Sequence, residues 1–294
     1  MQIVLLKKNE NGEFQKLTEV LPNGMIPNNC ILHKPTGAGA TYSEIKADRP
    51  SIIIEPNVPP IITKMNDPKH KNDNIIPVYE GVTVEHIIAK FTRHNPKIIT
   101  TPESFPKVKE AFEQMDIYMH GYAFMLVDEC HQNVTEAGYR PSINQIMDDF
   151  LLFRQKALVS ATPLAFSDPR LDDFEVLKVE PVEDILINID LYPTNNVLKT
   201  LETIIKKESA KPFFFYINSV DLTFSIMQKL EITGESSLFC SQEAVEKAKR
   251  EYKFKTAYSI WKPEYMRKYN FTTKRFQSAV DIIIPQHPLV FLVT

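Results

Sequence analysis

The chain has little glycine, few cysteines and no long apolar run. Only 8 of its 294 residues are glycine, well below the average of about 7%, so each glycine is expected where the backbone needs a conformation that other residues resist. The three cysteines lie far apart and suggest neither a disulfide framework nor a zinc motif, which indicates a reducing compartment. With 43% hydrophobic and 24% charged residues the composition excludes a disordered or collagen-like chain.

The lack of long apolar runs also bears on membranes and export. The longest runs, such as residues 52–54 and 213–217, fall far short of the roughly 20 residues that cross a bilayer. The first eight residues have neither the basic start nor the small-residue cleavage site of a signal peptide. We therefore expect a cytoplasmic protein without a membrane partner. Its oligomeric state is not indicated by the sequence.

Short apolar runs alternate with stretches of helical period, which is the pattern of a parallel sheet covered by helices. In the first half this predicts strands at residues 30–33, 51–55, 97–101, 124–128 and 157–160, and helices at 42–47, 83–92, 104–116 and 142–153. In the second half it predicts helices at 196–208, 222–230 and 243–252, and strands at 212–218, 237–240 and 288–294. The expected fold class is α/β with two parallel-sheet domains, residues 1–180 and 181–294, the second incomplete.

A glycine-containing segment joins the first predicted strand to a helical stretch. Its residues are Pro35, Thr36, Gly37, Ala38, Gly39, Ala40 and Thr41. A glycine-rich turn that leads into a helix presents backbone N–H groups to a phosphate. A Gly-x-Gly pair alone is as typical of a plain tight turn.

Polar residues also follow two of the apolar strands. Asp128 and Glu129 follow one apolar strand. Because the carboxyl ends of parallel strands line one crevice, we expect both carboxylates to lie near the glycine segment. Phosphoryl transfer needs one carboxylate for Mg²⁺ and another to orient the attacking water. A solvated strand end is the alternative for this pair. Ser160, Ala161 and Thr162 end another apolar strand, and by themselves these small residues do not indicate a function.

In this order and spacing the three segments resemble the motifs of superfamily-two helicases, the DEAD-box-like proteins. Asp128-Glu129-Cys130-His131 and Ser160-Ala161-Thr162 match the family's Asp-Glu-x-His and Ser-Ala-Thr motifs residue for residue. Residues 35–41 match its phosphate loop, except that Ala40 stands in place of the lysine. The resemblance implies two RecA-like helicase domains, the second truncated or short, which bind ATP with Mg²⁺ and a nucleic acid, either DNA or RNA.

The resemblance also implies a role for each matched residue. Residues 35–41 would hold the nucleotide, Thr41 and Asp128 would hold Mg²⁺, and Glu129 would orient the water. His131 would join these two carboxylates in the catalytic group and couple the nucleotide to the serine-containing segment. The implied coupling residues are Ser160, Ala161, Thr162 and Asp281, and the implied nucleic-acid contacts are Pro56, Asn57, Thr101, Pro102 and Thr272.

Two departures from the family pattern weaken the expected hydrolysis. A charge-assisted contact like that of the missing lysine is worth about 1.5–3 kcal/mol, and neither Lys34 nor Lys46 is expected to replace it. No arginine follows Arg275, although the family carries arginines there that reach the γ-phosphate. A truncated longer helicase, an engineered lysine-to-alanine change and a natural short form all fit this sequence.

We predict a nominally ATP-dependent helicase or translocase with weak or absent hydrolysis. The alternative is a non-catalytic nucleic-acid clamp or scaffold with the same fold. A third possibility, an unrelated small-molecule enzyme on the same sheet, would need a substrate pocket for which no residues are evident.

Two basic segments remain. Residues 243–275 carry ten Lys or Arg against four Glu, interleaved with seven aromatics, a combination typical of single-strand binding. Tyr258, Trp261 and Tyr265 also have the spacing of the buried face of a helix, and we favour that interpretation. The segment from Lys64 to Lys71 is predicted to be a solvated polar loop.

Overall fold

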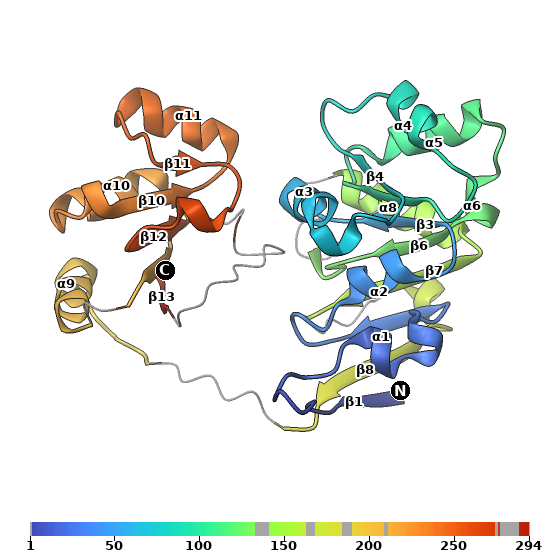
Figure 1. Cartoon of the computed structure of the whole chain (residues 1–294), viewed down its shortest axis with the longest axis horizontal. Helices are drawn as coiled ribbons and strands as arrows, with labels where there is room; N and C mark the ends of the chain where they lie inside the picture. The colour runs from blue at the N-terminus through green and yellow to red at the C-terminus, as the bar shows by residue number, and fades with distance from the viewer. Residues whose placement is uncertain are drawn as a thin grey trace. The chain divides into compact units, whose positions relative to one another are not determined.

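A computed structural model of the chain describes residues 2–132, 141–162, 168–183, 190–208, 211–273, 276 and 288–293. The chain divides into two compact units, residues 1–186 and 187–294. Each unit is built on its own parallel sheet (Figure 1). Among the described residues, no helix is long and apolar enough to cross a membrane.

The first unit contains an eight-stranded sheet in the order β1-β8-β2-β7-β6-β3-β5-β4, with every neighbouring pair parallel. Its strands are β1 (Gln2–Leu6), β2 (Cys30–His33), β3 (Ser51–Ile54), β4 (Ile75–Val78), β5 (Lys97–Thr100), β6 (Phe124–Val127), β7 (Gln155–Ser160) and β8 (Glu175–Pro181). Five of these lie where the sequence predicts strands. The additional strands β1, β4 and β8 lie toward the two sides of the sheet.

Helices cover both faces of this sheet. They are α1 (Leu17–Val20), α2 (Ala40–Lys46), α3 (Val58–Asn66), α4 (Val84–Lys90), α5 (Phe105–Gln114), α6 (Met119–Tyr122) and α8 (Pro141–Leu152). Short 3₁₀ turns occur at η1 (Pro22–Gly24), η2 (Pro68–His70) and η3 (Pro169–Leu171). α4 starts with a side-chain cap, because the Thr83 hydroxyl accepts a hydrogen bond from the His86 backbone N–H.

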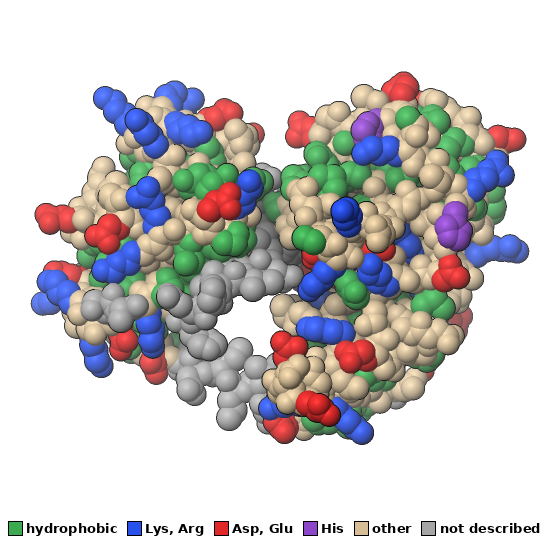
Figure 2. All heavy atoms as spheres, in the orientation of Figure 1, with side chains coloured by type: hydrophobic (Ala, Val, Ile, Leu, Met, Phe, Trp, Pro, Cys, Tyr) green, Lys and Arg blue, Asp and Glu red, His purple; other side chains and the backbone are tan. Residues whose placement is uncertain are grey.

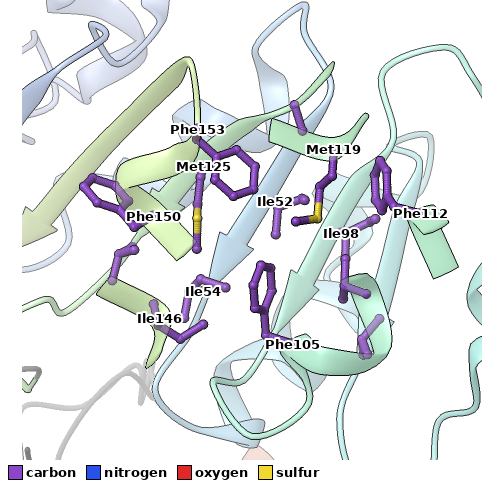
Figure 3. Packing of buried hydrophobic residues seen from close by; sticks show 14 of the residues in the cluster. Ile52, Ile54, Ile98, Phe105, Phe112, Met119, Met125, Ile146, Phe150 and Phe153 are labelled. Atoms are coloured by element: carbon purple, nitrogen blue, oxygen red, sulfur yellow. The ribbon is translucent and has the colours of Figure 1, made fainter. Parts of the chain in front are cut away.

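The two faces of the sheet form two separate cores, because alternate residues of each strand point to opposite sides. On one face Ile52 and Ile54 of β3 pack with Phe105 of α5 and Phe150 of α8 (Figure 3). On the other face Ile53 packs with the side chains of α1, α2 and α3. Apolar strands such as β6, with the sequence FMLV, are therefore buried on both sides, as in other parallel sheets.

The second unit contains a five-stranded parallel sheet in the order β11-β10-β12-β9-β13. Its strands are β9 (Phe213–Tyr216), β10 (Ser236–Phe239), β11 (Ala257–Tyr258), β12 (Tyr269–Thr272) and β13 (Leu289–Leu292). Its helices are α9 (Val197–Lys207), α10 (Val220–Lys229) and α11 (Gln242–Glu251), with 3₁₀ turns η4 (Thr233–Glu235) and η5 (Pro263–Tyr265). Phe215 is fully buried and lies with its ring centre 4.6 Å from that of Phe271.

The helix predicted through Tyr258, Trp261 and Tyr265 is absent from this described part of the second unit. Tyr258 ends β11, and its ring stacks at 4.0 Å on that of Tyr265 in η5. Pro263 explains the difference, because a proline inside a helix removes a backbone donor and clashes with the preceding turn. The aromatic rings are packed as expected, although on strands and turns instead of a helix face.

The segment from Lys64 to Lys71 is mostly exposed, as predicted, but it contains helical structure where a loop was expected. Lys64 lies on α3, and His70 in η2 is only 6% exposed, with its Nδ1 atom 2.7 Å from an oxygen of Asp73. Pro59 and Pro60 do not prevent α3 from forming. Both prolines lie in the first turn, where a missing backbone N–H costs no helical hydrogen bond.

Candidate functional site

Four neighbouring strands of the first sheet end beside one another. β2, β7, β6 and β3 are adjacent in this order and all parallel, so their carboxyl ends share one edge. The glycine segment follows β2, Ser160 ends β7, Asp128 follows β6 and Glu55 follows β3. Ligands of open α/β sheets bind at this edge, and the topology therefore gathers the sequence-predicted motifs into one candidate site.

The glycine segment has a backbone that few other residues would adopt. Gly37 and Gly39 have φ angles of +77° and +89°, in the left-handed region that favours glycine. A Cβ atom added at Gly37 would meet nothing within 4 Å, so the loop faces open space there. Residues before β2 also hold the loop in place. The Leu17 backbone N–H donates to the Ala38 carbonyl and the Lys16 ammonium to the Gly37 carbonyl, each at 3.0 Å.

A buried hydroxyl and a carboxylate link this loop to β6. The Thr41 hydroxyl donates to Asp128 Oδ2 at 2.5 Å, and both residues are less than one-tenth exposed. The other oxygen of Asp128 accepts a hydrogen bond of 2.8 Å from the Glu129 backbone N–H. The structure thus brings together the two residues that the resemblance assigns to Mg²⁺.

Glu55 is a further carboxylate at the site that sequence reasoning missed. It follows β3 and is only 1% exposed, with its Oε1 atom 3.3 Å from the Thr41 hydroxyl and 2.9 Å from the Lys64 ammonium. Burial raises the pKa of Glu55, the charge of Asp128 raises it further, and Lys64 opposes both. A glutamate at the end of an otherwise apolar strand is the signal that could have identified it.

Glu129 has an unusual backbone and a perturbed carboxyl group. Its φ angle of +49° lies in the left-handed region, which is uncommon for a residue with a side chain and clusters at functional sites. Burial raises the pKa of Glu129, the charge of Asp128 raises it further, and Lys34 and Lys64 lower it. The two adjacent carboxylates have different partners, because Asp128 Oδ2 accepts a hydrogen bond from Thr41 whereas Glu129 Oε2 lies 3.2 Å from His131 Nδ1.

His131 connects the acidic segment to β7. Its Nδ1 atom lies 2.9 Å from Ser160 Oγ and 3.2 Å from Glu129 Oε2. Ser160 Oγ also accepts a hydrogen bond of 3.0 Å from the Thr162 backbone N–H, with Ala161 between the two. The residues implied for coupling in the first unit are therefore in contact with one another, while Asp281 lies outside the described residues.

The position of the missing loop lysine is closed to solvent. Ala40 is 2% exposed and packs in the core between the sheet and α1 to α3. The Lys46 ammonium is directed elsewhere, donating to Asp73 at 2.7 Å and to the Lys69 carbonyl at 2.9 Å. The Lys34 backbone N–H donates to the Ser160 carbonyl, which places this residue at the junction of β2 and β7.

The candidate nucleic-acid residues have different exposures. Pro56 is buried and Asn57 half-buried between β3 and α3, whereas Thr101 is 4% exposed and Pro102 is also buried after β5. Thr272 belongs to the second unit, where it is 1% exposed and donates to the Phe215 carbonyl at 3.4 Å. In this structure only Asn57 of the five has appreciable surface.

The side chains at the site fit a hard cation. Mg²⁺ prefers oxygen ligands and is usually held by one or two carboxylates together with phosphates and water, and the Thr41 hydroxyl with the Asp128 carboxylate supplies such oxygens. Across the part of the chain that the structure describes, no three His, Cys, Asp or Glu residues are arranged to hold a metal by themselves. This donor set agrees with a cation whose remaining ligands are phosphate oxygens.

No protein-family model matches the chain, and neither does any curated protein sequence. Among solved structures, a chain in the S. cerevisiae complex of a Dbp5 variant with a Gle1 variant and IP6 is 15% identical, with a TM-score of 0.52 over 87% of this chain and 67% of that one. Mycobacterium smegmatis helicase Lhr bound to ssDNA and AMP-PNP is 14% identical, with a TM-score of 0.49 over 86% of this chain and 38% of that one. A DEAD box protein of Methanococcus jannaschii is 17% identical, with a TM-score of 0.41 over 92% of this chain and 76% of that one.

These similarities concern the fold. The match to the yeast structure, together with the two parallel sheets, shows an α/β fold with two RecA-like domains. The predicted fold class, α/β with two parallel-sheet domains, is therefore confirmed.

Proposed function

We propose that this chain is a helicase-like protein that binds ATP with Mg²⁺ at the carboxyl edge of its first sheet and also binds DNA or RNA. The observation that carries the proposal is the hydrogen bond of 2.5 Å between Thr41 and Asp128 beside a loop held by two left-handed glycines. A hydroxyl and a carboxylate in this relation are what P-loop proteins present to a nucleotide-bound metal.

Each group at the site has a defined task in this proposal. Residues 35–41 surround the phosphates, and Thr41 and Asp128 hold the Mg²⁺, which neutralises phosphate charge when bound. Glu129 accepts a hydrogen bond from the attacking water and orients it. Through Ser160, His131 links this carboxylate to the end of β7, so that a change at the nucleotide is transmitted to the segment 160–162.

The buried Ala40 favours a second candidate function. Because the loop itself supplies no ammonium, stabilisation of the transition state is reduced, and a nucleic-acid clamp that binds ATP without turnover is compatible with the same site. A phosphate-release assay with and without single-stranded nucleic acid separates the two, because a clamp binds nucleic acid without releasing phosphate.

The proposed nucleic-acid contacts include the residues implied by the resemblance, Pro56, Asn57, Thr101, Pro102 and Thr272. The second unit adds basic side chains along α11, among them Lys247, Lys249 and Arg250, and Figure 2 shows Lys and Arg gathered over this helix. Most rings of the 243–275 stretch are stacked or buried. We therefore expect binding through phosphate charges and a steep loss of affinity with salt.

The nucleotide proposal is tested by calorimetric titration of Mg²⁺·ATP into the chain, into Asp128→Asn and into Ala40→Lys. We expect the parent chain to bind and Asp128→Asn to lose its dependence on Mg²⁺. Thermal melts of all three proteins show whether they are folded. Failure of both the parent and a folded Ala40→Lys variant to bind ATP would contradict the proposal.

A further inference from the structure

A lysine from outside the glycine loop lies beside the proposed metal ligands. Lys64 is on α3, and its ammonium is 2.9 Å from Glu55 Oε1. The same carboxylate oxygen is 3.3 Å from the Thr41 hydroxyl, which itself donates to Asp128. A chain of three contacts therefore connects this ammonium to the centre of the candidate site.

The position of Lys64 follows from the helix that carries it. α3 begins shortly after β3, and Ile61 on its inner face is fully buried in the core. Lys64 is three residues further on, so it lies on nearly the same side of the helix. Its side chain is 22% exposed and therefore runs mostly along protein surface before the ammonium reaches Glu55.

The site needs a cation at this point for electrostatic reasons. Glu55, Asp128 and Glu129 follow the carboxyl ends of neighbouring strands, and a nucleoside triphosphate adds several further negative charges. The Lys64 ammonium, 2.9 Å from Glu55 Oε1, lies beside this group of acidic side chains.

We propose that Lys64 replaces the missing loop lysine as the cation that contacts the terminal phosphates, and that Glu55 positions it. This inference rests on the proposed nucleotide binding at the same site. An ammonium has three donors, so Lys64 can keep Glu55 as one partner while it donates to a phosphate oxygen. The flexible four-carbon stem allows the small movement that this requires.

The test compares Lys64→Met with Lys71→Met, a change at an exposed lysine of the next segment. Both variants lose one positive charge, and thermal melts without nucleotide show whether both are folded. In calorimetric titrations with Mg²⁺·ATP we expect Lys64→Met to bind about 10- to 100-fold more weakly than the parent. Lys71→Met should bind within about twofold of the parent, which excludes a general effect of net charge.

Two rescue variants show whether the charge itself matters. Lys64→Arg keeps a cation on α3 and should retain most of the affinity. Adding Ala40→Lys to Lys64→Met restores a cation from the loop and should recover binding, provided that the melt shows a folded protein. Recovery by either variant supports phosphate binding, whereas a purely structural role of Lys64 predicts no recovery from position 40.

The outcomes separate this inference from the proposed function. If the parent binds Mg²⁺·ATP and folded Lys64→Met binds it equally well, the role of Lys64 is wrong and the nucleotide site stands. If neither the parent nor folded Ala40→Lys binds ATP, the proposed function fails and this inference fails with it.

Discussion

Lys97 is a buried lysine that supports the helix following the glycine loop. Its side chain is 3% exposed, and its ammonium donates to the backbone carbonyls of Glu44, Ala47 and Arg49 at 2.6–2.8 Å. These carbonyls lie at and just beyond the end of α2, where helices leave acceptors without partners. Lys97 therefore satisfies the C-terminal end of the helix whose N-terminal end carries Thr41.

The burial of Lys97 predicts a pH dependence of stability. Burial lowers the pKa of Lys97 to about 8 from an ordinary 10.5, and nearby Arg49 also lowers it, while Glu44, Asp73 and Asp48 oppose the shift. Because the folded-state pKa is below the unfolded one, the unfolded chain binds more protons between these values. The contribution of this residue to stability is fully present above about 10.5 and is lost as the pH falls through about 8.

We therefore expect the free energy of unfolding of the parent, measured with urea, to rise relative to that of Lys97→Met between pH 7.5 and pH 9.5. At both pH values Lys97→Met should be destabilised by about 1–3 kcal/mol or more, because several carbonyls lose their donor. A difference between parent and variant that shrinks toward pH 9.5 would contradict the assignment.

At the same residue scale, Glu129→Gln tests the proposed water-orienting carboxylate. The amide keeps the shape of the side chain but cannot accept a proton, so ATP binding should stay within a few-fold of the parent. Phosphate release should fall by about 10²-fold or more. If the turnover of the parent is too low to measure, the comparison is made in the Ala40→Lys background, and unchanged release there would exclude this role.

The sequence predicted one part of this site and missed another for a physical reason. Asp128, Glu129 and His131 lie in one contiguous segment, so their chemistry is visible in the order of residues. Glu55 and Lys64 meet only because a helix starts after β3 and directs a side chain back to the strand end. Such a contact between elements leaves no local pattern.

At the scale of elements, proline has opposite effects on helix formation in two segments. Pro59 and Pro60 are compatible with α3, because the first turn of a helix accepts proline. Pro263 prevents the helix that the spacing of Tyr258, Trp261 and Tyr265 favours, because a proline in a helix interior is strongly unfavourable. The position of a proline within an element, which the sequence alone does not state, decides its effect.

The aromatic layer of the second sheet predicts a large effect of a single truncation. Phe215 of β9 is stacked between Phe271 of β12 and Phe291 of β13, with ring centres 4.6 and 5.1 Å away. Phe215→Ala should destabilise the second unit by about 3–5 kcal/mol, measured by urea unfolding. Phe215→Leu, which leaves a smaller cavity, serves as the control and should cost less.

At the scale of the whole molecule, the fold class was predictable while the width of the first sheet was not. Apolar strands such as β3 and β6 are buried on both faces and are therefore evident as continuous apolar runs. β8 mixes charged and apolar residues, and β4 contains Pro77. Strands with mixed composition at the sides of a sheet carry weaker signals.

Separate cores in the two units predict separate unfolding. Cys30 and Cys130 are buried in the first unit and Cys240 in the second. Burial raises the pKa of the Cys30 thiol to about 12, which leaves little reactive thiolate. We expect no thiol labelling of the native chain. During unfolding, Cys240 should become labelled at a different urea concentration from Cys30 and Cys130.

The Phe215→Ala variant links this measurement to the aromatic core. It should shift the urea concentration at which Cys240 becomes labelled and leave Cys30 and Cys130 unchanged. A common shift of all three thiols would show that the two units unfold as one.

The place of β1 in the first sheet determines when that sheet can be completed during translation. β1 pairs with β8 in a register that sets Gln2 against Leu177, so the partners are about 175 residues apart. At roughly 5–20 residues per second, the ribosome completes β8 on the order of 10–35 s after β1. β1 is therefore made before its partner β8 and can join the sheet only after β8 is available, and a nascent chain that stalls before β8 leaves one side of β2 open to another strand.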